Sequence, residues 1–331
     1  MVKMSDVAKL AKVSPATVSR VLTGTSYASE ETRQKVLDAI KTLDYKPNRL
    51  AGNLRKMSSQ TIMGVLPDIT NPFFAKIVQG IQHVAQAEGY HVLLGDTENS
   101  LPQEQKYLNL ARERVVDGLI LMTARIPKED ILAISEIVPI VLACEYYDDT
   151  SVPSVAIDNV SAAREMTQHL LRLGHKKIGF ITGPDSIIKR DRTRGYQEAL
   201  TKHGLSVDPD LIEAGDFSIE SGYAAAVRLL MNKEKLTAIC AAGDQMAAGA
   251  IKAVQAHNLR VPEDIAVTGF GNISLCTVMQ PELTTIAQPT YDMGQEAMKI
   301  LYRLLAGEAV QEKNVVLPYE LIIRQSCGAK K

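Results

Sequence analysis

The sequence has no tryptophan, and only five phenylalanines and four cysteines among its 331 residues. The cysteines, at positions 144, 240, 276 and 327, lie far apart without metal-ligand spacing, so buried, reduced thiols are expected. No run of about 18 apolar residues occurs, which argues against a transmembrane helix. Lysine and aspartate interrupt the N-terminal apolar residues, unlike a signal peptide. These absences are typical of a cytoplasmic protein.

Motifs of common α/β enzymes are missing as well. No GxGxxG follows a predicted strand, and we find no GxxxxGK[ST], HExxH or GxSxG. The six histidines are scattered, and His175 is interpreted as part of a solvated turn before a strand. We therefore expect no catalytic residue, no cofactor and no metal site. An enzyme or a small-molecule binding protein on a Rossmann-like core is the alternative from another class.

Met4 to Leu22 predicts a helix-turn-helix, whose second helix begins with Ser14 as a cap and Pro15 at its first position. Apolar side chains at helical spacing would be buried together: Val7, Ala8, Ala11, Val18, Val21 and Leu22. The other face carries small, hydroxylated and basic residues: Ser14, Pro15, Ala16, Thr17, Ser19 and Arg20. Such a face can enter the major groove of DNA, where one arginine can pair with guanine. An ordinary helical hairpin is the alternative.

A third helix is predicted from Ser29 to about Leu43, with acidic residues at the positive end of its dipole. Its apolar stripe would close a three-helix core and consists of Val36, Leu37, Ile40 and Leu43. Net positive charge is concentrated in the N-terminal part of the chain. Residues 1–60 hold 11 Lys or Arg against 5 Asp or Glu, whereas the whole chain has a net charge of −1. This predicts phosphate binding confined to the N-terminal segment and a steep salt dependence.

From residue 61 onward, strands alternate with helices, which predicts parallel sheets with right-handed crossovers. The first series has strands at 61–66, 91–95, 118–122, 140–142 and 155–157 and helices at 74–88, 102–114 and 128–135. The second has helices at 159–173, 190–203, 219–231 and 244–257 and strands at 178–181, 238–240 and 265–267. Two doubly wound subdomains follow, with a ligand cleft where their strand C-termini face each other.

Residues 2–56 resemble the headpiece of the lactose-repressor family, in the runs DVAKLAKVS and ATVSRVL and the pattern S-ETR-KV--AI--L-Y-PN-LA--LR. The resemblance continues through DITNPFF at 68–74, VDGLI at 116–120 and LTTI at 283–286. It implies a helix-turn-helix headpiece at 1–46, a hinge helix and linker at 47–60, and an effector-binding and dimerisation core at 61–331. The core would have a periplasmic-binding-protein-like fold, with lobe 1 at about 61–158 plus 290–319 and lobe 2 at about 159–289 plus 320–331. A helix at 290–305 would belong to lobe 1, and residues 315–323 would supply late strands.

The resemblance also implies how the protein meets DNA. The hinge within residues 47–60 would fold as a helix on a palindromic operator and enter the minor groove, with contacts from Asn48, Arg49, Ala51, Leu54 and Arg55. Leu54 would be the apolar wedge that opens a base step, flanked by basic residues as a minor-groove kink requires. In a homodimer, cleft closure would change the spacing of two headpieces. A plain linker is the alternative for 47–60.

Effector contacts implied by the resemblance are Asp68, Phe73, Phe74, Arg192, Phe217, Asp244 and Asn272. Alternatives stay open: Phe74 as a core plug, Arg192 as a solvated side chain, and the aspartates, including Asp158, as helix caps. One departure concerns Gly271, in the run GFGN, where the family usually has an aspartate that accepts hydrogen bonds from the ligand. Asn272 would then take over, or the ligand would differ, or small-molecule sensing would be weakened.

Finer resemblance favours the nucleoside-responsive members of the family, in the runs LLGD at 93–96, ACE at 143–145, GDFS at 215–218 and ELIIR at 320–324. It implies a pyrimidine nucleoside such as cytidine as effector, and cooperation on DNA with the cyclic-AMP receptor protein. A ribose or other sugar effector is the alternative within the family. The sequence thus predicts a nucleoid-associated repressor with no membrane partner.

Overall fold

The computed structural model describes residues 2–23, 28–45, 58–122, 125–232 and 236–329. They fall into two units, Met1–Ser59 and Gln60–Lys331. Within the described ranges, no helix has both the length and the apolar character needed to cross a membrane.

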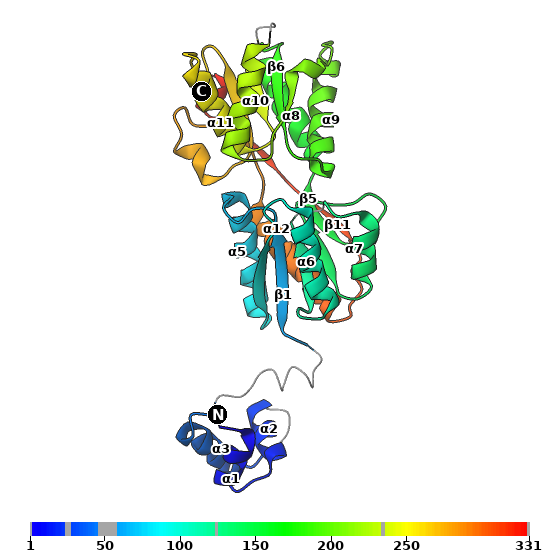
Figure 1. Cartoon of the computed structure of the whole chain (residues 1–331), viewed down its shortest axis with the longest axis vertical. Helices are drawn as coiled ribbons and strands as arrows, with labels where there is room; N and C mark the ends of the chain where they lie inside the picture. Colours follow the sequence, from blue (N-terminus) through cyan, green and yellow to red (C-terminus); the bar gives the residue numbers. More distant parts are fainter. Residues whose placement is uncertain (1, 24–27, 46–57, 123–124, 233–235, 330–331) are drawn as a thin grey trace. The chain divides into compact units, whose positions relative to one another are not determined.

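The first unit is a headpiece of three helices, α1 (Met4–Leu10), α2 (Pro15–Thr23) and α3 (Glu30–Thr42) (Figure 1). Ser29 caps α3 by accepting a hydrogen bond from the Thr32 amide, which satisfies one of the unpaired N–H groups of the first turn. The headpiece core consists of Val7, Ala8, Ala11, Val18, Val36, Ala39 and Tyr45.

The prediction that Leu37 belongs to the headpiece core is wrong. Leu37 is 43% exposed, whereas Ala39 is buried. With about 100° of rotation per residue, Ala39 lies on the same side of α3 as Val36, three positions away, and Leu37 turns toward solvent. A short methyl group at position 39 therefore fills the core beside Val36.

The first lobe of the second unit has a six-stranded parallel sheet in the order β11-β5-β4-β3-β1-β2. Its strands are β1 (Thr61–Leu66), β2 (His91–Asp96), β3 (Gly118–Leu121), β4 (Ile140–Ala143), β5 (Ser154–Ile157) and β11 (Asn314–Leu317). Helices cover both faces: α5 (Pro72–Ala87), α6 (Leu101–Arg112), α7 (Lys128–Ser135) and α12 (Thr290–Leu305). Ile62 joins the cluster that includes α5 and α12, and Met63 joins the cluster that includes α6 and α7. Burial on both faces is what a parallel sheet requires.

The second lobe has the strand order β12-β10-β9-β8-β6-β7, in which β12 alone among these strands runs antiparallel to its neighbour. Its strands are β6 (Ile178–Thr182), β7 (Ile212–Ala214), β8 (Ala238–Ala241), β9 (Ala266–Gly271), β10 (Thr284–Ala287) and β12 (Glu320–Ile322). Its helices are α8 (Asn159–Arg172), α9 (Ile187–Lys202), α10 (Ile219–Met231) and α11 (Asp244–Ala256). The predicted class, two doubly wound parallel-sheet subdomains behind an all-α headpiece, is confirmed.

The chain passes between the two lobes three times, from β5 to α8, from β10 to α12, and from β11 to β12 (Figure 1). Strands β7 and β10 do not follow from the sequence patterns, and α9 begins at Ile187 rather than at 190. Helix α5 begins at Pro72, two residues before the predicted start, because the Asn71 side chain accepts a hydrogen bond from the Phe73 amide.

Glycine allows one pair of helices in the first lobe to approach closely. A Cβ atom added to Gly80 of α5 would lie 2.1 Å from the carbonyl oxygen of Tyr291 in α12. A Cβ atom added to Gly294 of α12 would lie 2.0 Å from the carbonyl oxygen of Ile77 in α5. Any residue larger than glycine at either position would therefore force the backbone of the neighbouring helix to move.

Candidate functional site

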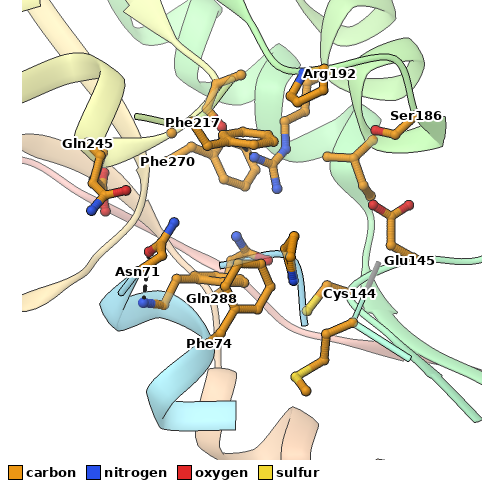
Figure 2. Close-up of a pocket in the computed structure, with 18 of the residues that line it drawn as sticks. Asn71, Phe74, Cys144, Glu145, Ser186, Arg192, Phe217, Gln245, Phe270 and Gln288 are labelled. Carbon is orange, nitrogen blue, oxygen red and sulfur yellow. Dashed lines mark hydrogen bonds between the residues drawn. The ribbon is translucent and has the colours of Figure 1, made fainter. Parts of the chain in front are cut away.

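A pocket open to solvent lies between the two lobes, and the empty space in and in front of it is about 810 Å³ (Figure 2). Its walls are loops that follow the carboxyl ends of strands in both sheets, where ligands bind in doubly wound folds. Lobe 1 contributes residues after β1, β3 and β4, including Asn71, Phe73, Phe74, Arg125, Cys144 and Glu145. Lobe 2 contributes residues after β6, β7 and β8, from the end of β9 and from α9, including Ser186, Arg192, Phe217, Asp244, Gln245 and Phe270. Gln288, on a crossing segment, completes the wall.

Four of the five phenylalanines of the chain line this pocket: Phe73, Phe74, Phe217 and Phe270. The first two, at the start of α5, meet edge to face with ring centroids 5.3 Å apart. Phe217 lies against glycines of two neighbouring loops, since a Cβ atom on Gly183 or Gly243 would come within 2.4 or 2.8 Å of its ring. The aromatic rings are thus concentrated in one place and come from both lobes.

Arg192 is the buried cation of the pocket, with 7% of its surface exposed. Its Nε donates to Asn159 Oδ1 at 2.9 Å and its Nη1 to the carbonyl of Ala242 at 2.5 Å. The guanidinium carbon lies 3.6 Å from the centroid of the Phe270 ring, a cation–π contact. Burial lowers the pKa of Arg192 to about 10, which leaves the group charged at neutral pH. Figure 2 shows the guanidinium at the edge of the pocket beside the aromatic rings.

Asp244 lines the pocket, but its carboxylate is bonded within lobe 2. Oδ1 accepts from the Thr285 hydroxyl at 2.6 Å, and Oδ2 accepts from the Ile273 amide at 2.9 Å. Burial raises the pKa of this carboxyl group, and the Thr285 hydroxyl opposes the rise. The Gly271 departure has a physical reason here. A Cβ atom at 271 would lie 3.1 Å from Asp244 Oδ2, on a backbone with φ of +135° that a side chain would strain.

Two of the seven expected effector contacts, Asp68 and Asn272, do not line the pocket. Asp68 Oδ1 accepts hydrogen bonds from the Thr70 amide and hydroxyl, so this carboxylate shapes the loop before α5. Asn272 Oδ1 accepts from Arg324 Nη2 at 2.7 Å. Both side chains are thus engaged by their own lobe. The expectation that Asn272 replaces the missing carboxylate does not fit this geometry.

Sequence reasoning did not identify several lining residues, among them Asn71, Ser186, Gln245, Phe270 and Gln288. Glu145, in the run ACE at 143–145, is another lining residue outside the expected contacts. Its position, two residues after the buried strand β4, was an available signal, because residues after parallel strands face the cleft. Its Oε2 is buried without a hydrogen-bond partner among the described residues. Burial raises the pKa of Glu145 to about 8, although Arg192 favours the ionised form.

A polar contact joins the lobes beside the pocket. The Tyr146 hydroxyl, from the loop after β4, donates to Asp191 Oδ2 at the start of α9. The neighbouring Arg190 Nη1 donates to Asp148 Oδ2 at 2.8 Å. Asp191 is 2% exposed, so its bond with Tyr146 is well shielded, while the Arg190–Asp148 pair is about half exposed. We call these four residues the inter-lobe latch.

In the headpiece, α2 carries the expected reading face. Ser14, Pro15, Ala16 and Arg20 are exposed, Thr17 and Ser19 are half-buried, and Val18 on the opposite side is fully buried. The Ser14 hydroxyl accepts from the Thr17 amide at 3.1 Å, which caps the helix. The other expected DNA contacts, at positions 48, 49, 51, 54 and 55, lie outside the described residues.

Two protein-family models match this chain. One, described as bacterial regulatory proteins of the lacI family, matches residues 3–48. The other, a periplasmic binding protein-like domain, matches residues 167–327. Both matches agree with the fold observed in the corresponding unit.

Full-length relatives lead to the same family. The chain is 39% identical over 328 residues to the HTH-type transcriptional repressor CytR of Escherichia coli (strain K12), across 98% of this chain and 96% of that protein. It is 35% identical over 327 residues to the ribose operon repressor of Halalkalibacterium halodurans, across 98% and 97%. The lac repressor dimer bound to operator and the anti-inducer ONPF matches with a TM-score of 0.89 and 31% identity over 99% of both chains. These relatives are regulators and not enzymes, so the chain belongs to the lacI family of bacterial regulatory proteins and is a DNA-binding transcription regulator.

Proposed function

We propose that this protein is a homodimeric repressor that binds a palindromic operator and is controlled by a pyrimidine nucleoside, such as cytidine, in the inter-lobe pocket. In this proposal α2 reads the major groove, and residues 47–60 form the hinge that enters the minor groove, with Leu54 as its wedge. Residues 61–331 sense the effector and dimerise. The protein would act at the nucleoid, and would cooperate on DNA with the cyclic-AMP receptor protein.

The concentration of phenylalanines in the pocket carries the nucleoside proposal. Flat rings from both lobes suit a planar base, which gains from offset or edge contacts with aromatic side chains. Arg192 can donate to a carbonyl on that base, and Glu145 Oε2, which no described residue bonds, can meet a polar edge. The resemblance of the sequence to nucleoside-responsive members of the family, in runs such as ACE at 143–145 and GDFS at 215–218, supports the same ligand class.

A sugar effector is the second candidate. Amide side chains of Asn71, Asn99, Gln245 and Gln288 also line the pocket and could bond several hydroxyl groups. Similarity to the ribose operon repressor favours it.

Fluorescence anisotropy on labelled operator DNA distinguishes these candidates. The operator is first selected from random DNA by the purified protein, and the complex is then titrated with cytidine, uridine, adenosine, ribose and other sugars. Release by cytidine supports the nucleoside proposal. Release by a sugar alone would overturn it in favour of the second candidate, and release by none would leave the aromatic pocket without its proposed role.

Arg20→Ala is expected to weaken operator binding by about 1–3 kcal/mol and to relax specificity at one base pair, because one arginine reads one guanine edge. Anisotropy with operators that vary at single positions measures this. Lys41→Ala, near the end of α3, provides a control that removes one headpiece charge. A uniform loss over all sequences would instead identify Arg20 as a phosphate contact.

Tyr146→Phe is expected to weaken effector binding about threefold to tenfold. The contact that holds the two lobes together beside the pocket would lose its hydrogen bond to the buried Asp191 carboxylate. Calorimetric titration with the releasing ligand measures the change. Tyr107→Phe is the matched control, since its hydroxyl bonds the Asp96 carbonyl within lobe 1. Equal affinities of the two variants would show that the latch does not contribute to closure.

A further inference from the structure

Glu145 is a half-buried acid at the wall of the ligand pocket, and one of its carboxyl oxygens, Oε2, is buried. Its Oε2 has no hydrogen-bond partner among the described residues, although two arginines line the same pocket. Both arginines are engaged elsewhere. Arg192 donates to Asn159 and Ala242, and Arg125 donates to the backbone and side-chain oxygens of Asn99 at 2.7 and 2.9 Å. Oε2 of Glu145 is therefore available for a hydrogen bond with a ligand in the pocket.

Charges around Glu145 come from several elements and have both signs. Arg192 and Arg125 favour its ionised form, whereas Glu104 of α6 and Asp191 of α9 oppose it. Removal from water is the dominant effect, and it raises the pKa of Glu145 to about 8. The acid is therefore mostly neutral at pH 7, which a hydrogen-bonded or ion-paired carboxylate would not be. The titratable and charged groups that interact electrostatically with it are Cys144, Tyr147, Arg192, Arg125, Glu104 and Asp191.

A neutral carboxylic acid presents a hydroxyl donor and a carbonyl acceptor side by side, whereas a carboxylate presents acceptors only. A cytosine base has the complementary edge, with a ring nitrogen acceptor next to an amino donor. We propose that Glu145 binds the effector as the neutral acid, donating its hydroxyl to the ring nitrogen of the base and accepting from the neighbouring amino group. This inference rests on the proposed nucleoside function and deepens it.

The proposal explains how one site could prefer a base over a sugar. A pair of ribose hydroxyls can donate two hydrogen bonds to a carboxylate, and such charge-assisted bonds favour the ionised acid. The phenylalanines would hold the plane of the base while Glu145 reads its edge. Because only the neutral form pairs correctly, affinity is at its maximum below the pKa of Glu145. It falls as the pH rises through that value, by about tenfold per unit.

The test is calorimetric titration of the full-length protein with cytidine from about pH 6 to about pH 9, a range in which cytidine itself does not titrate. We expect the dissociation constant to be flat below pH 7 and about tenfold higher at pH 9 than at pH 7. Near pH 8, repeated titrations in buffers with different heats of ionisation should show proton uptake on binding.

Glu145→Gln is the decisive variant, because an amide keeps a donor and an acceptor side by side but does not titrate. It should bind cytidine within about threefold of the native protein at pH 7, without pH dependence or proton uptake. Glu136→Gln, on the exposed end of α7, should behave as the native protein does.

Two outcomes would overturn the inference while cytidine still binds: a flat pH profile in the native protein, or a tenfold or greater loss in Glu145→Gln at pH 7. The second would mean that an ionised Glu145 accepts from hydroxyls. If no nucleoside binds at any pH, the proposed function itself fails, and the inference falls with it.

Discussion

Replacing Arg192 by alanine is expected to abolish release of operator DNA by the effector while leaving operator affinity unchanged. The buried guanidinium is the fixed cation of the pocket, held by Asn159, Ala242 and the face of the Phe270 ring. A charged donor that contacts a ligand in a desolvated site contributes about 2–5 kcal/mol. Effector affinity should therefore fall by about 30-fold or more.

Anisotropy on the selected operator, with and without ligand, measures both properties of the Arg192 variant. Arg194→Ala is the matched control, because Arg194 lies on the same helix but is 57% exposed and pairs with Glu198. Arg192→Lys should recover only part of the response, since an ammonium group cannot reproduce the planar fork. Normal release by the alanine variant would show that Arg192 serves the fold of lobe 2 rather than the ligand.

Much of the fold could be predicted because its signals are local. Buried parallel strands appear as short apolar runs, and caps such as Ser29 lie immediately before their helices. The two strands that were not predicted depend on tertiary contacts. Thr284 and Thr285 of β10 are fully buried, yet their hydroxyls bond the Arg324 amide and the Asp244 carboxylate, partners 40 and 41 residues away. No pattern within one segment reveals such partners.

The candidate site was predictable in outline for a different reason. Phe73, Phe74, Arg192, Phe217 and Asp244 were selected through family resemblance, and all five line the pocket. Resemblance gives a position but not the bonds that a side chain makes.

Two expected contacts illustrate this limit. Asp68 is bonded to Thr70 within its own loop, whereas Asn272 is bonded to Arg324 from the end of β12. That no described residue bonds Oε2 of Glu145 is a property of packing, which the sequence around position 145 does not reveal.

Gly294→Ala is expected to destabilise the core by about 3 kcal/mol, although alanine favours helices over glycine by about 1 kcal/mol. The added methyl group would lie 2.0 Å from the Ile77 carbonyl oxygen and 3.0 Å from the Ile81 amide nitrogen. These are backbone atoms of α5, which cannot rotate away as the end of a side chain can, so α5 and α12 must separate. Thermal and urea unfolding of the core measure the loss, with Lys299→Ala on the exposed face of α12 as the control.

The same substitution should also weaken effector binding, because α5 begins with two of the pocket phenylalanines. Separating α5 from α12 moves Phe73 and Phe74 relative to Gln288, which lies two residues before α12 and lines the same pocket. A shift of about 1 Å at a positioned contact is enough to lower affinity substantially. A destabilised variant that still bound its effector normally would show that the two phenylalanines adapt to the ligand, and that helix packing does not set the geometry of the pocket.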